Sequence, residues 1–184
     1  MTKECKDYLL FLARSTIAGE LGTKWDKYVP KPNDPELKEQ KGTFVTLTID
    51  GELRGCIGQI LPSEPIEDTI RENALSAAFY DPRFSPLSPS EFNKVKIEIS
   101  ILSKPEEFKY TSTDELLAHL KPNVHGLIIK FGGRGATFLP QVWEDLPSKE
   151  AFLSHLCMKA GLEDQAWKTL KLQVLTYTVE HFEE

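Results

Sequence analysis

Two runs of alternating residues joined by Asp50-Gly51 constrain the fold more than any other part of the sequence. In TFVTLTI, residues 43–49, apolar side chains alternate with threonines, and this period of two is typical of a half-buried β-strand. Asp-Gly between two such runs is a strong signal for an antiparallel hairpin. We therefore predict a β-hairpin over residues 43–60, whose second strand carries LRGCIG, residues 53–58.

The length of the hairpin loop decides which face of the sheet LRGCIG presents. A two-residue loop would place Arg54 and Cys56 on the face of the valine, leucine and isoleucine of the first strand. An odd loop, with Gly51 in a left-handed bulge position, shifts the alternation by one residue. Leu53 and Ile57 then join the apolar face, and the arginine and the thiol join the threonines. We favour the odd loop because it keeps an arginine out of the core.

The rest of the chain mixes helical and strand patterns without a strict strand–helix–strand rhythm. Apolar periodicity predicts helices in residues 1–21, 62–80, 111–120 and 148–162, the last one capped by Ser148 and ended by Gly161. Strands are predicted in residues 94–102 and 170–182, and a second hairpin in residues 125–142 with its turn at 132–135. This order favours an α+β fold with antiparallel sheets flanked by helices.

Residues 22–41 form a long polar connection that contains three prolines. Connections of this length are usually either functional or disordered. Trp25 and Tyr28 lie within it, and these large apolar side chains predict that the segment packs against the protein.

Charge and composition exclude several classes of protein. The net charge of −6, with lysines and arginines scattered along the sequence, disfavours binding to nucleic acid. No apolar run approaches the length that crosses a bilayer, and Arg14 interrupts the short apolar stretch near the N-terminus, so we expect no membrane segment and no signal peptide. Three widely spaced cysteines do not form a disulfide framework, which favours a cytoplasmic protein.

Cys56 is the best candidate for a nucleophile. Arg54, two residues before it, could stabilise a thiolate, while Gly55 and Gly58 would let a ligand approach the backbone. The alternative is that the glycines serve a bulged strand and that Cys56 is a small buried apolar residue. Bordered by apolar residues, Arg54 needs a carboxylate or an anionic ligand, and Glu98 in the KIEIS strand is a candidate partner. The alternative is that Arg54 is a solvent-exposed arginine on an open sheet.

Other candidate site residues lie in separate segments. Glu98 or His125 could act as the base for Cys56. DPRF places Asp81 and Arg83 directly after a helix; they either end the helix or bind substrate from a loop over a cleft. FGGRG, residues 131–135, lacks the spacing of a phosphate-binding loop and is better explained as a hairpin turn. The histidines form no metal-binding motif.

A family resemblance rests on motifs along almost the whole chain. GTFVTL, LRGCIG, DPRFSPL, IEISIL, HGLII, LPQVW and FLSHLCMKAGL occur in this order, and together they resemble the AMMECR domain family. The resemblance implies a single domain over residues 1–184, with two unequal, intertwined lobes of antiparallel sheets and a cleft between them lined by LRGCIG. It also implies Memo-like and radical S-adenosylmethionine (SAM) proteins as partners, but it supplies no activity and no cofactor.

Two hypotheses for function follow from these observations. The first is an enzyme, or an enzyme component, that acts on a small polar or anionic metabolite, with Arg54, Gly55, Gly58, Asp81 and Arg83 binding the substrate and Cys56 as nucleophile. The second is a non-catalytic module that binds a partner protein, or presents a substrate to the Memo-like and radical SAM proteins.

Overall fold

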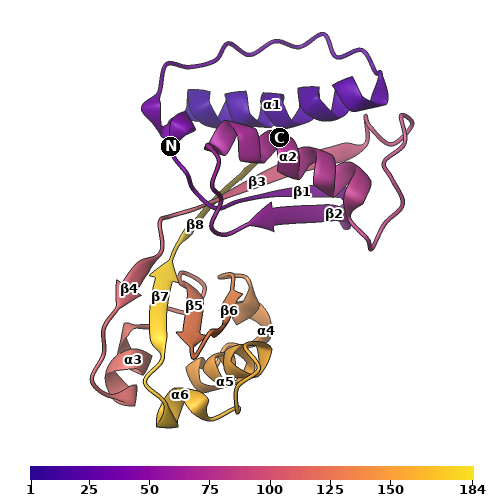
Figure 1. The fold of residues 1–184 in the computed structure, drawn as a ribbon. Helices are drawn as coiled ribbons and strands as arrows, with labels where there is room; N and C mark the ends of the chain where they lie inside the picture. Colours follow the sequence, from indigo (N-terminus) through magenta and orange to yellow (C-terminus); the bar gives the residue numbers. More distant parts are fainter. The chain divides into compact units, whose positions relative to one another are not determined.

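The computed structural model describes residues 1–184, which form two compact units (Figure 1). The first unit contains Met1–Leu102 and Glu180–Glu184, and the second contains Ser103–Val179. The last five residues therefore return to the unit in which the chain began. Helices and antiparallel strands occur in both units, which confirms the α+β class.

The first unit is a four-stranded sheet with two long helices on one face. The strand order is β2-β1-β3-β8, formed by β1 (Thr43–Ile49), β2 (Glu52–Gln59), β3 (Val95–Leu102) and β8 (Val179–Glu183). Helices α1 (Lys3–Leu21) and α2 (Ile66–Leu75) contact each other, and α1 contacts β3 while α2 contacts β1 and β2 (Figure 1). Their apolar side chains form one core with the inward residues of β1 and β3. The opposite face of the sheet carries Thr46 and Thr48 of β1, whereas Thr43 lies on the core face and accepts from Asn73 of α2.

The hairpin of β1 and β2 corrects part of the sequence prediction. Ile49 pairs with Glu52, so the loop is the two-residue one, and the positive φ angles of Asp50 (52°) and Gly51 (84°) are those of the turn that matches strand twist. A bulge at Arg54, further along β2, supplies the shift in alternation instead. Cys56 is therefore on the threonine face as predicted, but Leu53 is opposite Thr48 and 42% exposed rather than on the apolar face.

Segment 22–41 packs on the first unit through Trp25, as predicted, whereas Tyr28 is 79% exposed. It contains the 3-10 helix η1 (Pro35–Lys38), whose Leu37 is buried in the core. Trp25 meets Phe92 edge-on with ring centroids 5.6 Å apart, and Tyr28 meets Phe11 in the same way at 6.1 Å.

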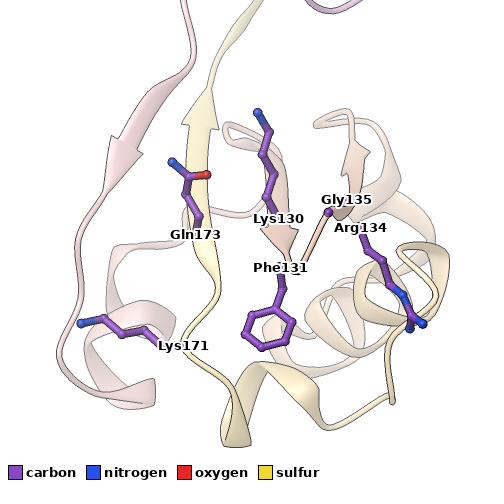
Figure 2. Close-up of a pocket in the computed structure, with 8 residues that line it drawn as sticks. Lys130, Phe131, Arg134, Gly135, Lys171 and Gln173 are labelled. Carbon is purple, nitrogen blue, oxygen red and sulfur yellow. The ribbon is translucent and has the colours of Figure 1, made fainter.

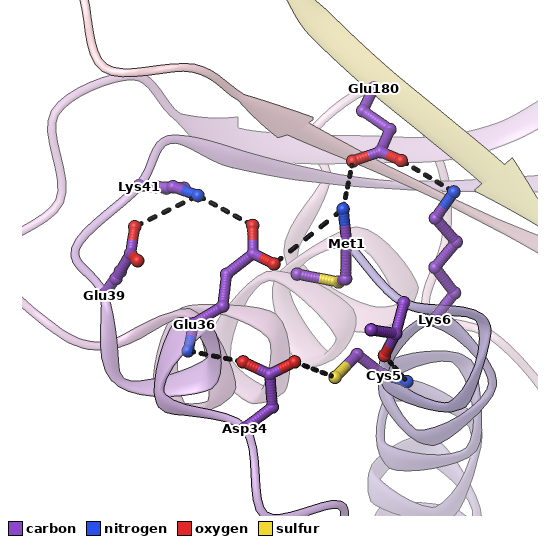
Figure 3. A network of polar contacts seen from close by, with 9 residues as sticks. Met1, Cys5, Lys6, Asp34, Glu36, Glu39, Lys41 and Glu180 are labelled. Carbon is purple, nitrogen blue, oxygen red and sulfur yellow. Dashed lines mark hydrogen bonds and ion pairs between the residues drawn. The ribbon is translucent and has the colours of Figure 1, made fainter.

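Charged side chains fasten the returning strand β8 to the start of the chain (Figure 3). Glu180 accepts from the amino group of Met1 at 3.3 Å and from Nζ of Lys6 at 2.6 Å. The same network runs on through η1, where Glu36 lies 3.8 Å from the Met1 amino group and 2.8 Å from Nζ of Lys41. The C-terminal strand is thus held to α1 and η1 by ion pairs as well as by the sheet.

Arg14 is a buried arginine whose donors are almost all used. Its guanidinium donates to the backbone oxygens of Phe92 (2.7 Å) and Val95 (2.6 Å) and pairs with the carboxylate of Glu184. It also lies over the rings of Trp25 and Phe92. One side chain of α1 therefore holds the connection before β3, segment 22–41 and the C-terminal residue together.

The second unit is a four-stranded sheet with helices packed on one of its faces. The order is β4-β7-β5-β6, formed by β4 (Glu106–Phe108), β7 (Gln173–Tyr177), β5 (Gly126–Phe131) and β6 (Arg134–Phe138). Helices α3 (Thr113–His119), α4 (Val142–Asp145), α5 (Lys149–Lys159) and α6 (Ala166–Thr169) complete it. Ser148 caps α5 and Gly161 follows it with a positive φ of 73°, both as predicted. The predicted second hairpin turns at Gly132 and Gly133.

We predict that Arg14→Met destabilises the first unit strongly. The substitution leaves two carbonyls and the Glu184 carboxylate without their donor, and removing one partner of a buried ion pair costs about 3–5 kcal/mol. Urea unfolding followed by circular dichroism measures the loss. Lys3→Met is the matched control, because Lys3 forms an exposed pair with Asp7 one turn along α1 that contributes about 0.5 kcal/mol at most. Equal losses for the two variants would contradict the role given to Arg14.

Candidate functional site

Cys56 is the only cysteine of the three whose side chain is not buried. Cys5 and Cys157 are both 0% exposed, whereas Cys56 is half-buried and no two cysteines form a disulfide. Burial raises the pKa of the Cys5 and Cys157 thiols, which keeps them protonated and unreactive. Any thiol chemistry of this chain must therefore take place at Cys56.

The Cys56 thiol lies on the threonine face of the first sheet, in a row of three residues. Cys56 is directly opposite Thr46 of β1, which is directly opposite Glu98 of β3. The Thr46 hydroxyl donates to Sγ of Cys56 at 3.3 Å. Since neighbouring strands are about 4.8 Å apart, the strand of Glu98 is about 10 Å from that of the thiol. Glu98 is thus on the predicted face, but it does not contact the sulfur directly.

Asp81 and Arg83 hold the backbone of Cys56. The Cys56 N–H donates to Oδ2 of Asp81 at 2.9 Å, and Nη2 of Arg83 donates to the Cys56 carbonyl at 3.2 Å. Arg83 also donates through Nε and Nη2 to the two carboxylate oxygens of Asp81, at 2.9 and 2.7 Å. We call these two residues the edge clasp, because they fill the outward hydrogen-bonding positions of the edge strand β2.

The electrostatics of the edge clasp follow from this geometry. Hydrogen bonds from Arg83 hold the pKa of the buried Asp81 carboxyl far below its usual range, with a further contribution from the Cys56 N–H. The same hydrogen bonds raise the pKa of Arg83, and a negative charge on Cys56 acts in the same direction. The Arg83 guanidinium is therefore paired with Asp81 and contacts the backbone of Cys56.

Arg54 has a different partner from the one predicted. Its Nε donates to Oε1 of Glu91 at 2.8 Å and its Nη2 donates to the Ser85 carbonyl at 2.9 Å, so Glu98 is not its partner. The Arg54 guanidinium and the Ser88 N–H lower the pKa of Glu91 to about 2. Nη1 of Arg54 is buried and has no hydrogen-bond partner. Arg54 therefore fastens the connection between the π-helix η2 (Ser76–Tyr80) and β3 to strand β2.

The two glycines of LRGCIG lie against protein. A methyl group on Gly55 would overlap the carbonyl oxygen of Ala77, in the π-helix η2 (Ser76–Tyr80) that leads directly to Asp81. A methyl group on Gly58 would overlap the Phe44 ring and the Thr43 carbonyl. The bare backbone at these positions is used for close packing, which favours the structural alternative stated for them above.

His125 belongs to the second unit, where it lies beside His119. The two ring centroids are 5.2 Å apart, and His119 stacks on Phe108 at 3.6 Å. The backbone N–H of Lys121 approaches Nδ1 of His125 at 3.4 Å, while Nε2 of His119 is buried without a partner. The role of His125 as a base for Cys56 stays a prediction.

Two residues that complete this site, Thr46 and Glu91, carry little or no signal of that role in the sequence. Thr46 was assigned only to a face, because no local pattern shows that its hydroxyl meets a sulfur on the next strand. Glu91 had a visible signal: Ser88 and Glu91 fit the Ser-x-x-Glu capping pattern, and Glu91 accepts from both the N–H and the hydroxyl of Ser88.

No group of three or more histidine, cysteine, aspartate or glutamate side chains is arranged to hold a metal ion. No helix combines the length and apolar character needed to span a bilayer.

We predict that Gly55→Ala costs about 1–3 kcal/mol of unfolding free energy, because the methyl group forces β2 and η2 apart. Gly19→Ala is the control. Gly19 lies in α1 with open space around it and no positive φ, so alanine should stabilise the helix by about 0.5–1 kcal/mol. Urea unfolding measures both changes, and a Gly55→Ala protein as stable as the parent would show that the close approach is not needed.

We predict that His119 and His125 titrate below their ordinary pKa of about 6.5. Burial lowers the pKa of both, and the charge of Lys121 lowers them further. Since the unfolded chain binds these protons at higher pH, their contribution to stability is complete above about pH 6.5 and is lost as the pH falls through the lowered values. NMR titration of the ring protons measures both midpoints. Lys121→Gln should move them upward, and a parent midpoint at or above 6.5 would contradict the prediction.

A family model, related proteins and a solved structure each match most or all of the chain. A family model described as AMMECR1 matches residues 10–182. Protein MK0488 of Methanopyrus kandleri is 37% identical over 192 residues, covering 100% of this chain and 90% of that protein. Protein Mbar_A1807 of Methanosarcina barkeri is 42% identical over 164 residues, covering 85% and 79%. The crystal structure of the uncharacterized protein PH0010 from Pyrococcus horikoshii superposes with a TM-score of 0.81 at 34% identity, covering 100% of this chain and 93% of that one.

Proposed function

The chain belongs to the AMMECR1 family, and on this premise we propose that its first unit is an enzyme, or a component of one, that acts on a small polar or anionic metabolite through Cys56. One observation carries the proposal: the one thiol of the chain that is not buried accepts a hydrogen bond from Thr46, and the exposed Arg83 guanidinium donates to the carbonyl of the same residue. A hydroxyl donor and a nearby guanidinium both stabilise a thiolate, which is the nucleophilic form of cysteine.

The roles of the neighbouring residues follow from their free hydrogen-bonding groups. Arg83 is 53% exposed at its side chain, and its Nη1 makes no hydrogen bond within the chain, so it can receive an anionic group of the substrate. Arg54 is 14% exposed and already neutralised by Glu91, so its first role is to hold the connection that carries the edge clasp. Glu98 is one strand too far to take the thiol proton and would transfer a proton on the substrate instead.

A second candidate function is a module that binds Memo-like or radical SAM proteins without catalysis. The observation that favours it is that most polar groups around LRGCIG are paired within the chain: Arg54 with Glu91, and Arg83 with Asp81. A pre-formed, internally satisfied surface suits recognition by a partner protein. In this case a Cys56→Ser protein would still co-purify with its partners. We place the protein in the cytoplasm under either function, since its three cysteines are all free.

We predict that iodoacetamide alkylates Cys56 faster than it alkylates a free model thiol between about pH 6 and pH 9, because Thr46 and Arg83 favour the thiolate. Mass spectrometry of the native protein gives the rate at each cysteine. Cys5 and Cys157 are internal controls that should stay unlabelled until the protein unfolds. Thr46→Val keeps the side-chain shape and removes the hydroxyl, so it should slow the reaction.

Two outcomes would count against the catalytic proposal. If Cys56 reacts no faster than N-acetylcysteine at every pH tested, the thiol is not activated. If Thr46→Val leaves the rate unchanged while Cys56 remains fast, the activation does not come from the residue row on the sheet.

A further inference from the structure

The two units of the chain differ in net charge and in how far their charged side chains form ion pairs. Residues 103–179 contain nine lysines or arginines and nine aspartates or glutamates, so the second unit is formally neutral and the net charge of −6 belongs to the first. Every ion pair of the structure joins two residues of the first unit. The charges of the second unit are balanced in number but are not paired with one another.

Four exposed lysines of the second unit surround three neighbouring hollows, of about 550, 500 and 440 Å³. We call Lys109, Lys130, Lys168 and Lys171 the lysine surface. Lys171 lines all three hollows, and each of the other three lysines lines one of them. The only carboxylate among the lining residues is Glu107, which accepts from Nε2 of Gln173 at 3.1 Å.

Strand pairing places Lys130 on the face of the sheet away from the core, whereas Lys168 lies in helix α6, and Lys109 and Lys171 lie just outside strands β4 and β7. Lys130 is directly opposite Gln173 on β7, whereas the neighbouring Ile129 and Val174 point into the helix-covered core. Figure 2 shows Lys130 and Gln173 extending side by side, with Arg134 turned away from them. On β6, Gly135 pairs with Lys130 and has no side chain, so only backbone lies beside Lys130 on that strand.

The lysine surface carries an excess of positive charge that an anionic ligand would neutralise. Unpaired lysines grouped on one face create a local positive potential that attracts anions even when the whole chain is acidic. The three hollows share Lys171 and open to solvent, so together they form an extended surface rather than an enclosed pocket. An extended, negatively charged ligand fits that shape.

The observations favour an acidic polypeptide over a nucleic acid. Binders of single-stranded nucleic acid stack successive bases on several exposed aromatic rings, whereas Phe131, 39% exposed, is the one exposed ring that lines the hollows. Trp167 is only 2% exposed, and Phe108 stacks on His119. The Tyr110 hydroxyl is tied to both backbone groups of Leu172. Nucleic acid also brings one charge with every nucleotide, so the acidic first unit opposes it more than it opposes a short acidic peptide. We propose that the lysine surface binds an acidic segment of another polypeptide.

Fluorescence anisotropy of the full chain with a labelled peptide of alternating glutamate and glycine, about ten residues long, tests the proposal at about 50 mM salt. We expect saturable binding that weakens as salt is added. The double variant Lys130→Glu/Lys171→Glu should bind at least about tenfold more weakly. Its matched control is Lys104→Glu/Lys121→Glu, which makes the same change of net charge at exposed lysines that line none of the hollows and should keep most of the affinity.

Several results would overturn the inference. Absence of saturable peptide binding would show that the lysine surface holds no acidic segment. Equal weakening in both double variants would show that the peptide responds to net charge alone. Tighter binding of a single-stranded RNA of equal charge than of the peptide would assign the surface to nucleic acid instead. Circular dichroism melting confirms that each variant is folded, and none of these outcomes depends on whether Cys56 is reactive.

Discussion

The edge clasp on Cys56 is the interaction on which the candidate site depends. β2 is the edge strand of its sheet, and the outward N–H and C=O groups of such a strand usually lack partners. Asp81 accepts from the N–H of Cys56 and Arg83 donates to its carbonyl, as a neighbouring strand would. With the backbone fixed in this way, the thiol has a defined place on the sheet face, next to the Thr46 hydroxyl.

The edge clasp is possible only because β2 and the helix before Asp81 come very close together. The π-helix η2 brings the Ala77 carbonyl against Gly55, where no side chain could be accommodated, and π-helical turns often occur where a chain must be redirected at a functional site. Arg54 and Glu91 then hold the far end of the same connection. Residues that look like a ligand-binding motif in sequence thus serve first to build one rigid corner, and the thiol is the group left available for chemistry.

The second unit differs from the first in that its charged side chains form no ion pairs with one another. Its charges remain unpaired within the unit, and its two partly buried histidines have a lowered pKa because burial disfavours their charged forms, with a further contribution from Lys121. The first unit uses ion pairs such as Arg14 with Glu184, and Lys6 with Glu180, to fasten its helices and its returning strand. The first unit therefore combines tight internal pairing with one accessible thiol, and the second presents charge to the solvent.

The sequence by itself determined the elements: the alternation in TFVTLTI, the Asp50-Gly51 turn, the Ser148 cap and the Gly161 stop are local patterns, and local backbone preferences are sufficient to produce them. It also placed Cys56 on the threonine face, although through an odd loop rather than the bulge at Arg54 that actually shifts the strand. Only the tertiary structure decided that Arg54 pairs with Glu91, that Asp81 and Arg83 reach Cys56, and that lysines from three separate segments line neighbouring hollows. These contacts join residues far apart in the chain, so their distances depend on how whole elements pack, which no short stretch of sequence encodes.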